Sequence, residues 1–171
     1  MRRSSAVLAI LAALAFAPSA ASADPAYTPQ TIIDVFAKQA LGKPRALCVG
    51  DEAECPAPEE SPRFDLLVTF DFNSDRLTPE AKENLNQFAL ALKDPRLSSQ
   101  SFAIDGHTDA TGSESYNLGL SERRARAVVS YLKTLGLDTD RLTAKGFGKA
   151  KPRVADPFDP VNRRVETRLD Q

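Results

Sequence analysis

The chain has 171 residues, of which 42% are hydrophobic and 26% charged, and its formal net charge is -1. These values are typical of a soluble globular protein with one ordinary domain and some additional chain. Because a nucleic-acid-binding surface needs a strong excess of Lys and Arg, the near-zero charge balance argues against a nucleic-acid partner. Composition alone therefore leaves the function to be argued from motifs.

The first residues have the features of a secretory signal peptide. Arg2 and Arg3 precede an apolar run that ends at Ala17, and Ala21-Ser22-Ala23 has the A-x-A form of a cleavage site. The run is shorter than the roughly 20 apolar residues of a transmembrane helix, so no transmembrane span is expected in the mature chain. We expect residues 1–23 to direct export and cleavage to precede Asp24; the alternative is an uncleaved anchor.

Residues 24–63 are expected to form an N-terminal segment. Its apolar positions predict a short helix over residues 31–41, which packs either on the following domain or on a partner protein. In an oxidising compartment Cys48 and Cys55 are expected to form a local disulfide; two free thiols are the alternative. The Pro- and Glu-rich stretch from Cys55 to Pro62 is typical of a linker.

The main domain, residues 64–171, shows alternating strand and helix patterns. Strands are predicted over residues 64–72, 101–105, 142–147 and 162–169. A helix with Thr78 as its N-cap and Pro79 at its first position follows the first strand, and a second helix continues to Leu135. This order predicts an α+β fold, βαβαββ, in which two main helices pack on one face of a mixed sheet, with the N-terminal helix as an appendage.

Arg124 is the most informative residue of the second helix. It shares one helical stripe with Leu120, Val128 and Leu132, which are apolar. A guanidinium on a core-facing stripe is costly unless it meets a carboxylate, supplied either by the fold or by a ligand. Asp109 is the candidate partner, and together the two charges could hold a small zwitterion. A helix-capping role for Asp109 is the alternative.

Two further side chains need an interpretation. Arg163 shares one face of the last predicted strand with Val165, Thr167 and Leu169, so it is in register with apolar neighbours. His107 is the only histidine; without a second His or a nearby Cys it is expected to be a hydrogen-bonded structural residue rather than a metal ligand. Ser113, His107 and Asp109 are too close in sequence for a credible catalytic triad, so no enzyme, metal or cofactor is predicted.

Four short motifs follow one another at domain spacing from about Phe64 onward. They are Val68-Thr69-Phe70-Asp71-Phe72-Asn73-Ser74, Gly106-His107-Thr108-Asp109-Ala110-Thr111-Gly112-Ser113, Tyr116-Asn117-Leu118-Gly119-Leu120-Ser121-Glu122-Arg123-Arg124-Ala125 and Asn162-Arg163-Arg164-Val165-Glu166. With these motifs in this order, the chain resembles the OmpA-like peptidoglycan-binding domain shared by outer-membrane protein A, peptidoglycan-associated lipoprotein and MotB. The loop Lys149–Pro160 departs from the family by being shorter and richer in proline.

The resemblance implies a ligand, the diaminopimelate of a peptidoglycan stem peptide, bound without cleavage. In the family pattern Asp109 takes the ammonium of the distal centre of this residue and Arg124 takes its carboxylate. Thr111, Asn117 and Arg163 line the same pocket, and the end of the first strand adds contacts at Asp71, Phe72 and Asn73. These additional positions, apart from Arg163, rest on the resemblance alone.

The sequence therefore predicts a periplasmic module that binds peptidoglycan and tethers or organises the bacterial envelope, with association with the outer membrane left open. The alternative is an exported scaffold whose main partner is another envelope protein, held through the N-terminal segment.

Overall fold

The computed structural model of the chain describes residues 24–40, 62–71 and 74–170. In chain order the elements are α1 (Pro29–Ala40), β1 (Arg63–Asp65), α2 (Pro79–Leu92), β2 (Phe102–Gly106), α3 (Glu114–Thr134), the 3-10 helix η1 (Thr139–Arg141), β3 (Leu142–Gly146), the 3-10 helix η2 (Pro160–Asn162) and β4 (Val165–Leu169). The predicted signal peptide, the linker and both cysteines lie outside the described residues. Within those residues, no helix has the length and apolar character needed to cross a membrane.

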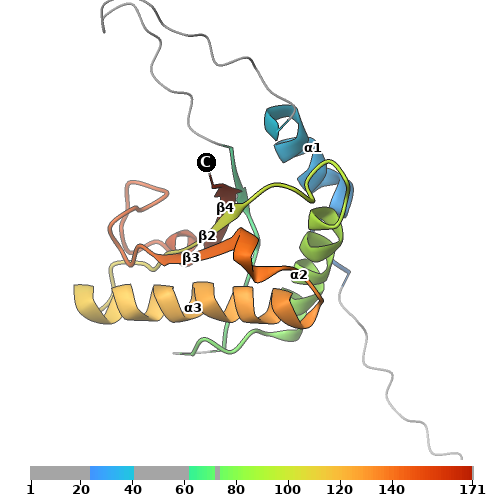
Figure 1. Cartoon of the computed structure of the whole chain (residues 1–171). Coiled ribbons are helices and arrows are strands. Elements are labelled where there is room, and N and C mark those ends of the chain that lie inside the picture. The colour runs from blue at the N-terminus through green and yellow to red at the C-terminus, as the bar shows by residue number, and fades with distance from the viewer. Residues whose placement is uncertain (1–23, 41–61, 72–73, 171) are drawn as a thin grey trace, which may run out of the picture.

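The strands form one mixed sheet in the order β1-β4-β2-β3, and α3 runs along it (Figure 1). β2 is parallel to β3, as expected for two strands joined by a crossover helix, whereas β4 is antiparallel to both β1 and β2. The α+β prediction with a mixed sheet is therefore confirmed.

The first strand is shorter than its sequence pattern predicted. β1 ends at Asp65, and further along only an isolated bridge joins Phe70 to Leu77. The cause is local: the Asp65 Oδ1 atom accepts a 2.9 Å hydrogen bond from the Leu67 backbone N–H, and Leu67 has a φ of 46°. A non-glycine residue in this left-handed region cannot continue an extended strand, so the prediction of one strand over residues 64–72 is wrong.

The predicted core of the helices is confirmed. The Thr78 side chain caps α2 by accepting a hydrogen bond from Ala81 N, with Pro79 at the first helical position. The Phe102 ring of β2 lies 6.2 Å from the ring of Phe88 in α2 and 5.3 Å from that of Phe36 in α1, both edge-on. Helices from both sides of the linker therefore pack against the same face of the sheet.

The N-terminal helix is part of this core, a choice that the sequence left open. Tyr27, just before α1, is buried, and its hydroxyl donates a 3.1 Å hydrogen bond to the Leu66 carbonyl oxygen. The backbone N–H of Ala26 donates to Asn84 Oδ1 at 2.8 Å, and the apolar face of α1 packs beside α2 (Figure 1). α1 therefore packs on the domain, and its apolar residues are buried in that contact.

Two glycines let α3 lie directly on the ends of the parallel strands. A Cβ atom added at Gly106 would lie 2.2 Å from the Ser121 carbonyl oxygen, and one added at Gly146 would lie 2.6 Å from the Glu122 nitrogen. Gly106 is the last residue of β2 and is paired with Gly146 of β3. The positive φ of the loop between β2 and α3 falls at Gly112, at 94°.

The position of α1 generates the first prediction. We expect Phe36→Ala to lower the free energy of unfolding by about 3–5 kcal/mol, because the ring is fully buried against Phe102. Leu90→Ala, on the exposed side of α2, should change it by less than about 0.5 kcal/mol. Urea denaturation of both variants measures the difference; equal stabilities would contradict a core role for α1.

Candidate functional site

The loop between β2 and α3 holds Asp109 in a fixed position. Backbone hydrogen bonds tie this loop to both sides, from Thr108 N to Gly148 O at 2.9 Å and from Ala110 N to Pro157 O at 2.8 Å. The carboxylate of Asp109 is buried: Oδ1 accepts from Thr111 N at 3.0 Å, and Oδ2 accepts from Arg163 Nη1 at 2.6 Å. Burial alone raises the pKa of Asp109, but these hydrogen bonds outweigh it and hold the pKa below its ordinary value.

The start of α3 is fastened to the same loop. Asn117 is buried, and its side-chain amide donates to Thr111 O at 2.9 Å and to Asp109 O at 3.4 Å. The helix is capped by Ser113, whose hydroxyl accepts from Tyr116 N. The capping alternative for Asp109 is therefore wrong, and its carboxylate is left for Arg163 and Thr111. The structure brings together four of the predicted site residues: Asp109, Thr111, Asn117 and Arg163.

Arg124 lies half-buried on the predicted stripe of α3, beside the core residue Val128. Its Nε atom donates a 3.1 Å hydrogen bond to Ser74 O, and its guanidinium lies 4.8 Å from the centre of the Phe70 ring. No ion pair joins it to Asp109 or Asp105, which pair with Arg163 and Arg168 instead. Burial lowers the pKa of Arg124, while the charge of Asp109 acts in the opposite direction.

The predicted ligand contacts at the end of the first strand, Asp71, Phe72 and Asn73, stay predictions. Phe72 and Asn73 fall outside the described residues. Asp71 is half-exposed and lies 3.6 Å from Arg76 Nε across the turn that follows. The next residue that the structure describes, Ser74, is the one that contacts Arg124.

Arg163 is positioned differently from its sequence interpretation. It precedes β4, directly after η2, and its side chain is 49% exposed, so it does not extend the apolar face formed by Val165, Thr167 and Leu169. Arg164 is the buried arginine: its Nε atom donates to Glu166 Oε1 at 2.6 Å. The expectation that Arg163 belongs to the buried face of the strand is wrong, because β4 begins at Val165, three residues later than predicted, and Arg163 precedes it.

On the face of the sheet away from the helices, Glu166 forms ion pairs with arginines from several parts of the chain. Besides Arg164, its carboxylate accepts from Arg153 Nη2 at 3.3 Å and from Arg63 Nη1 at 3.5 Å. Arg153 also donates to Asp65 Oδ2 at 2.6 Å. This network fixes the position of the segment that carries Arg163. Neither Glu166 nor Ser121 was identified from the sequence; the signal available for Glu166 was its register with Arg164 and Arg168 on one face of the last predicted strand.

His107 is structural, but not in the way that was expected. Its side chain is fully buried and stacks on Phe147 at 5.3 Å, and neither ring nitrogen has a hydrogen-bond partner within the described part of the chain. Its Nε2 atom lies 3.8 Å from Glu166 Oε2. The prediction of a hydrogen-bonded histidine is wrong.

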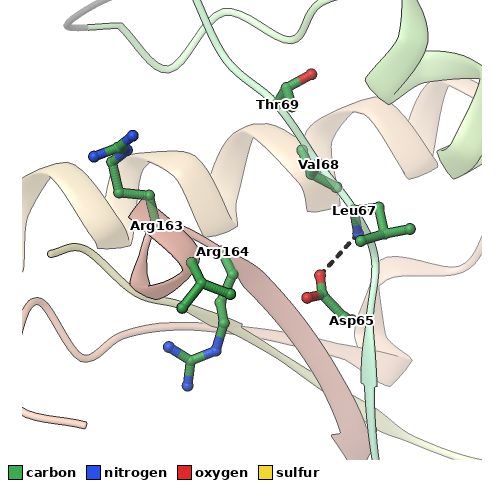
Figure 2. Close-up of a pocket in the computed structure, with 7 residues that line it drawn as sticks. Asp65, Leu67, Val68, Thr69, Arg163 and Arg164 are labelled. Atoms are coloured by element: carbon green, nitrogen blue, oxygen red, sulfur yellow. Dashed lines mark hydrogen bonds between the residues drawn. The ribbon is translucent and has the colours of Figure 1, made fainter. Parts of the chain in front are cut away.

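A hollow of about 220 Å³ adjoins the site between residues 65–69 and 161–164, and Figure 2 shows Arg163 at its border. Of the predicted site residues that the structure describes, only Arg163 lines it.

The fold and the cluster define a class of protein: an α+β domain that presents an ion-paired carboxylate loop and a half-buried arginine at one end of a mixed sheet. The chain belongs to the OmpA family, whose sequence model matches residues 69–166. It is 39% identical over 116 residues to outer membrane protein A of Shigella flexneri, a match that covers 66% of this chain and 33% of that protein. The chain thus spans about a third of that relative's length.

Solved structures agree with this family. The OmpA-like domain of FopA1 from Francisella tularensis subsp. tularensis SCHU S4 aligns with a TM-score of 0.54 at 30% identity, covering 60% of this chain and 71% of that one. The peptidoglycan-associated lipoprotein from Burkholderia pseudomallei aligns with a TM-score of 0.51 at 32% identity, covering 60% and 86%.

The environment of His107 generates a prediction about pH. Burial, helped by the nearby Arg164 charge, lowers the pKa of His107 from 6.5 to about 4. The unfolded chain therefore binds more protons between these pH values, so the free energy of unfolding rises with pH in this window and falls on acidification, by up to about 3 kcal/mol.

We expect His107→Leu to remove this part of the pH dependence, measured by urea denaturation between pH 6.5 and pH 5. Glu166 and Asp109 also have lowered pKa values, but their contribution is lost mainly below the ordinary carboxyl pKa of about 4. An unchanged slope in the variant would contradict the assignment to His107.

Proposed function

We propose that this protein binds peptidoglycan non-covalently through the diaminopimelate residue of the stem peptide, and so attaches to the bacterial cell wall. The observation that carries the proposal is a pair of unlike charges, one in the loop before α3 and one in the middle of that helix. Asp109 offers an ionised, positioned carboxylate, and Arg124 offers a half-buried guanidinium for which the described residues supply no carboxylate at ion-pair distance.

The distal end of diaminopimelate carries an ammonium and a carboxylate on one carbon. In the proposed complex the ammonium binds Asp109, which shares its charge between the ligand and Arg163. The carboxylate binds Arg124, whose Nε is already held by Ser74 O, so its terminal nitrogens are directed with little loss of freedom. Asn117 and Thr111 hold the loop, and thereby the spacing of the two charges.

The family relationship supports this proposal, since one of the similar solved structures is a peptidoglycan-associated lipoprotein. It also supports a location in the cell envelope, which we propose to be the periplasm.

We propose binding without catalysis. The Ser113 hydroxyl accepts the capping hydrogen bond from Tyr116 N, and the buried His107 ring stacks on Phe147, so neither is arranged as a nucleophile or base beside Asp109. The scaffold alternative is weakened because the apolar residues of α1, which motivated it, are used in the domain's own core.

Co-sedimentation of the purified mature protein with insoluble sacculi tests the proposal. We expect Asp109→Ala and Arg124→Ala each to lose binding, because removing one partner of a charge-assisted pair costs about 2–5 kcal/mol. Arg126→Ala, two residues along α3 and exposed, and Asp140→Ala, exposed on η1, are the matched controls and should sediment like the wild type. Wild-type sedimentation of the two site variants would contradict the proposed pocket.

Exchanging the wall is a second, independent test. Lysine-type peptidoglycan lacks the distal carboxylate that is assigned to Arg124, so we expect the wild type to bind it at least tenfold more weakly than the diaminopimelate type, from the roughly 2 kcal/mol lower end of the same cost. Arg124→Ala should discriminate between the two walls far less than the wild type does. Equal wild-type binding to both walls would show that the distal carboxylate is not recognised.

A further inference from the structure

The hollow beside Arg163 has a definite structural origin. β1 and β4 run antiparallel, and their last pairing beyond Asp65 is the 3.0 Å hydrogen bond from Leu66 N to Val165 O. At Leu67 the left-handed backbone turns the chain away, and the two segments separate. The separation leaves a hollow of about 220 Å³ lined by residues that include Leu67, Val68, Thr69 and Val161 (Figure 2).

Most polar groups around this hollow already have partners. The Asp65 carboxylate accepts from Leu67 N and Arg153 Nη1, and the buried Arg164 guanidinium donates to Glu166. Thr69 Oγ1 lies 2.7 Å from Thr78 Oγ1.

Arg163 differs from these groups. Its side chain is 49% exposed, and its hydrogen bond to Asp109 uses one terminal nitrogen of a guanidinium that has five N–H donors. In Figure 2 its side chain and that of Arg164 leave the chain in opposite directions. Arg163 therefore has donors left for an anion at the border of the hollow.

The apolar walls of the hollow indicate the chemistry of the rest of the ligand. Leu67 and Val161 are 48% and 40% exposed, so apolar surface on both sides faces solvent and would gain from being covered. The volume is below the roughly 300–1,000 Å³ of sites for drug-sized ligands, and suits a small residue rather than a sugar chain. A short apolar residue that carries a free carboxylate matches this chemistry.

We propose that this hollow is a subsite for the terminal alanine of a stem tetrapeptide, with its carboxylate on Arg163 and its methyl group between Leu67 and Val161. The inference rests on the proposed function, because Arg163 joins the two places. When the diaminopimelate ammonium shares Asp109, Arg163 is released in part and donates to the next carboxylate along the peptide. The protein would then recognise two adjacent residues of the stem peptide.

Calorimetric titration with three soluble stem peptides tests this subsite. They are a tripeptide ending in diaminopimelate, the tetrapeptide with one further alanine, and the same tetrapeptide with a C-terminal carboxamide. For the wild type we expect the tetrapeptide to bind roughly three- to tenfold more tightly than the tripeptide, and the carboxamide to lose this advantage.

Val161→Trp, which fills the hollow, should abolish the preference for the tetrapeptide and keep the affinity for the tripeptide. Val161→Asp, which places a negative charge beside the alanine carboxylate, should do the same. Val154→Trp is the matched control, because Val154 is also an exposed valine, at 37%, and does not line the hollow; it should keep the preference.

Equal binding of tripeptide and tetrapeptide by the wild type would overturn the subsite and leave the proposed function standing. Loss of the preference in Val154→Trp as well, or loss of tripeptide binding in the Val161 variants, would also overturn it. Failure of the wild type to bind any of the three peptides would instead overturn the proposed function, and the subsite with it.

Discussion

The close approach of α3 to the ends of β2 and β3 is the constraint on which the site depends. Gly106 and Gly146 lie side by side in the sheet, and neither has room for a Cβ atom beneath the Ser121–Glu122 backbone. Ser121 adds a side-chain link, its hydroxyl accepting from Gly148 N at 2.8 Å. Because the helix is held this closely, Asn117 reaches the Asp109 loop, and Arg124, two turns further along, contacts Ser74.

The two faces of the sheet differ in chemistry and in what they stabilise. The face toward the helices is apolar and centres on Phe102, whereas the other face carries a buried network of charges around Glu166. Such networks contribute little net stability, since desolvation opposes the Coulomb attraction, but they restrict geometry strongly. Here the network joins Arg63, Arg153 and Arg164, and thereby fixes the segment from which Arg163 reaches Asp109. The charge network around Glu166 thus helps to hold Arg163, and with it the Asp109 pair, in position.

The N-terminal helix completes the apolar face instead of extending away from it. Phe36 of α1 and Phe88 of α2 both pack edge-on against Phe102, and the Tyr27 ring lies 4.9 Å from that of Phe64. Two helices on a sheet of four short strands would leave the apolar surface around Phe102 partly open, and α1 covers it.

Local patterns in the sequence determined the order of the elements, the cap at Thr78, the apolar stripe around Arg124 and the family, because periodicity, capping and motif spacing depend on neighbours in the chain. Thr111 and Asn117 could be predicted only through the resemblance. The tertiary structure decided which arginine is buried, that Asp109 pairs with Arg163 rather than Arg124, and that the first strand stops at Asp65. The pair of Asp109 with Arg163 spans 54 residues, and such a long-range contact leaves no periodic signal in the sequence. The single left-handed residue at Leu67 ends the strand although the apolar pattern continues past it.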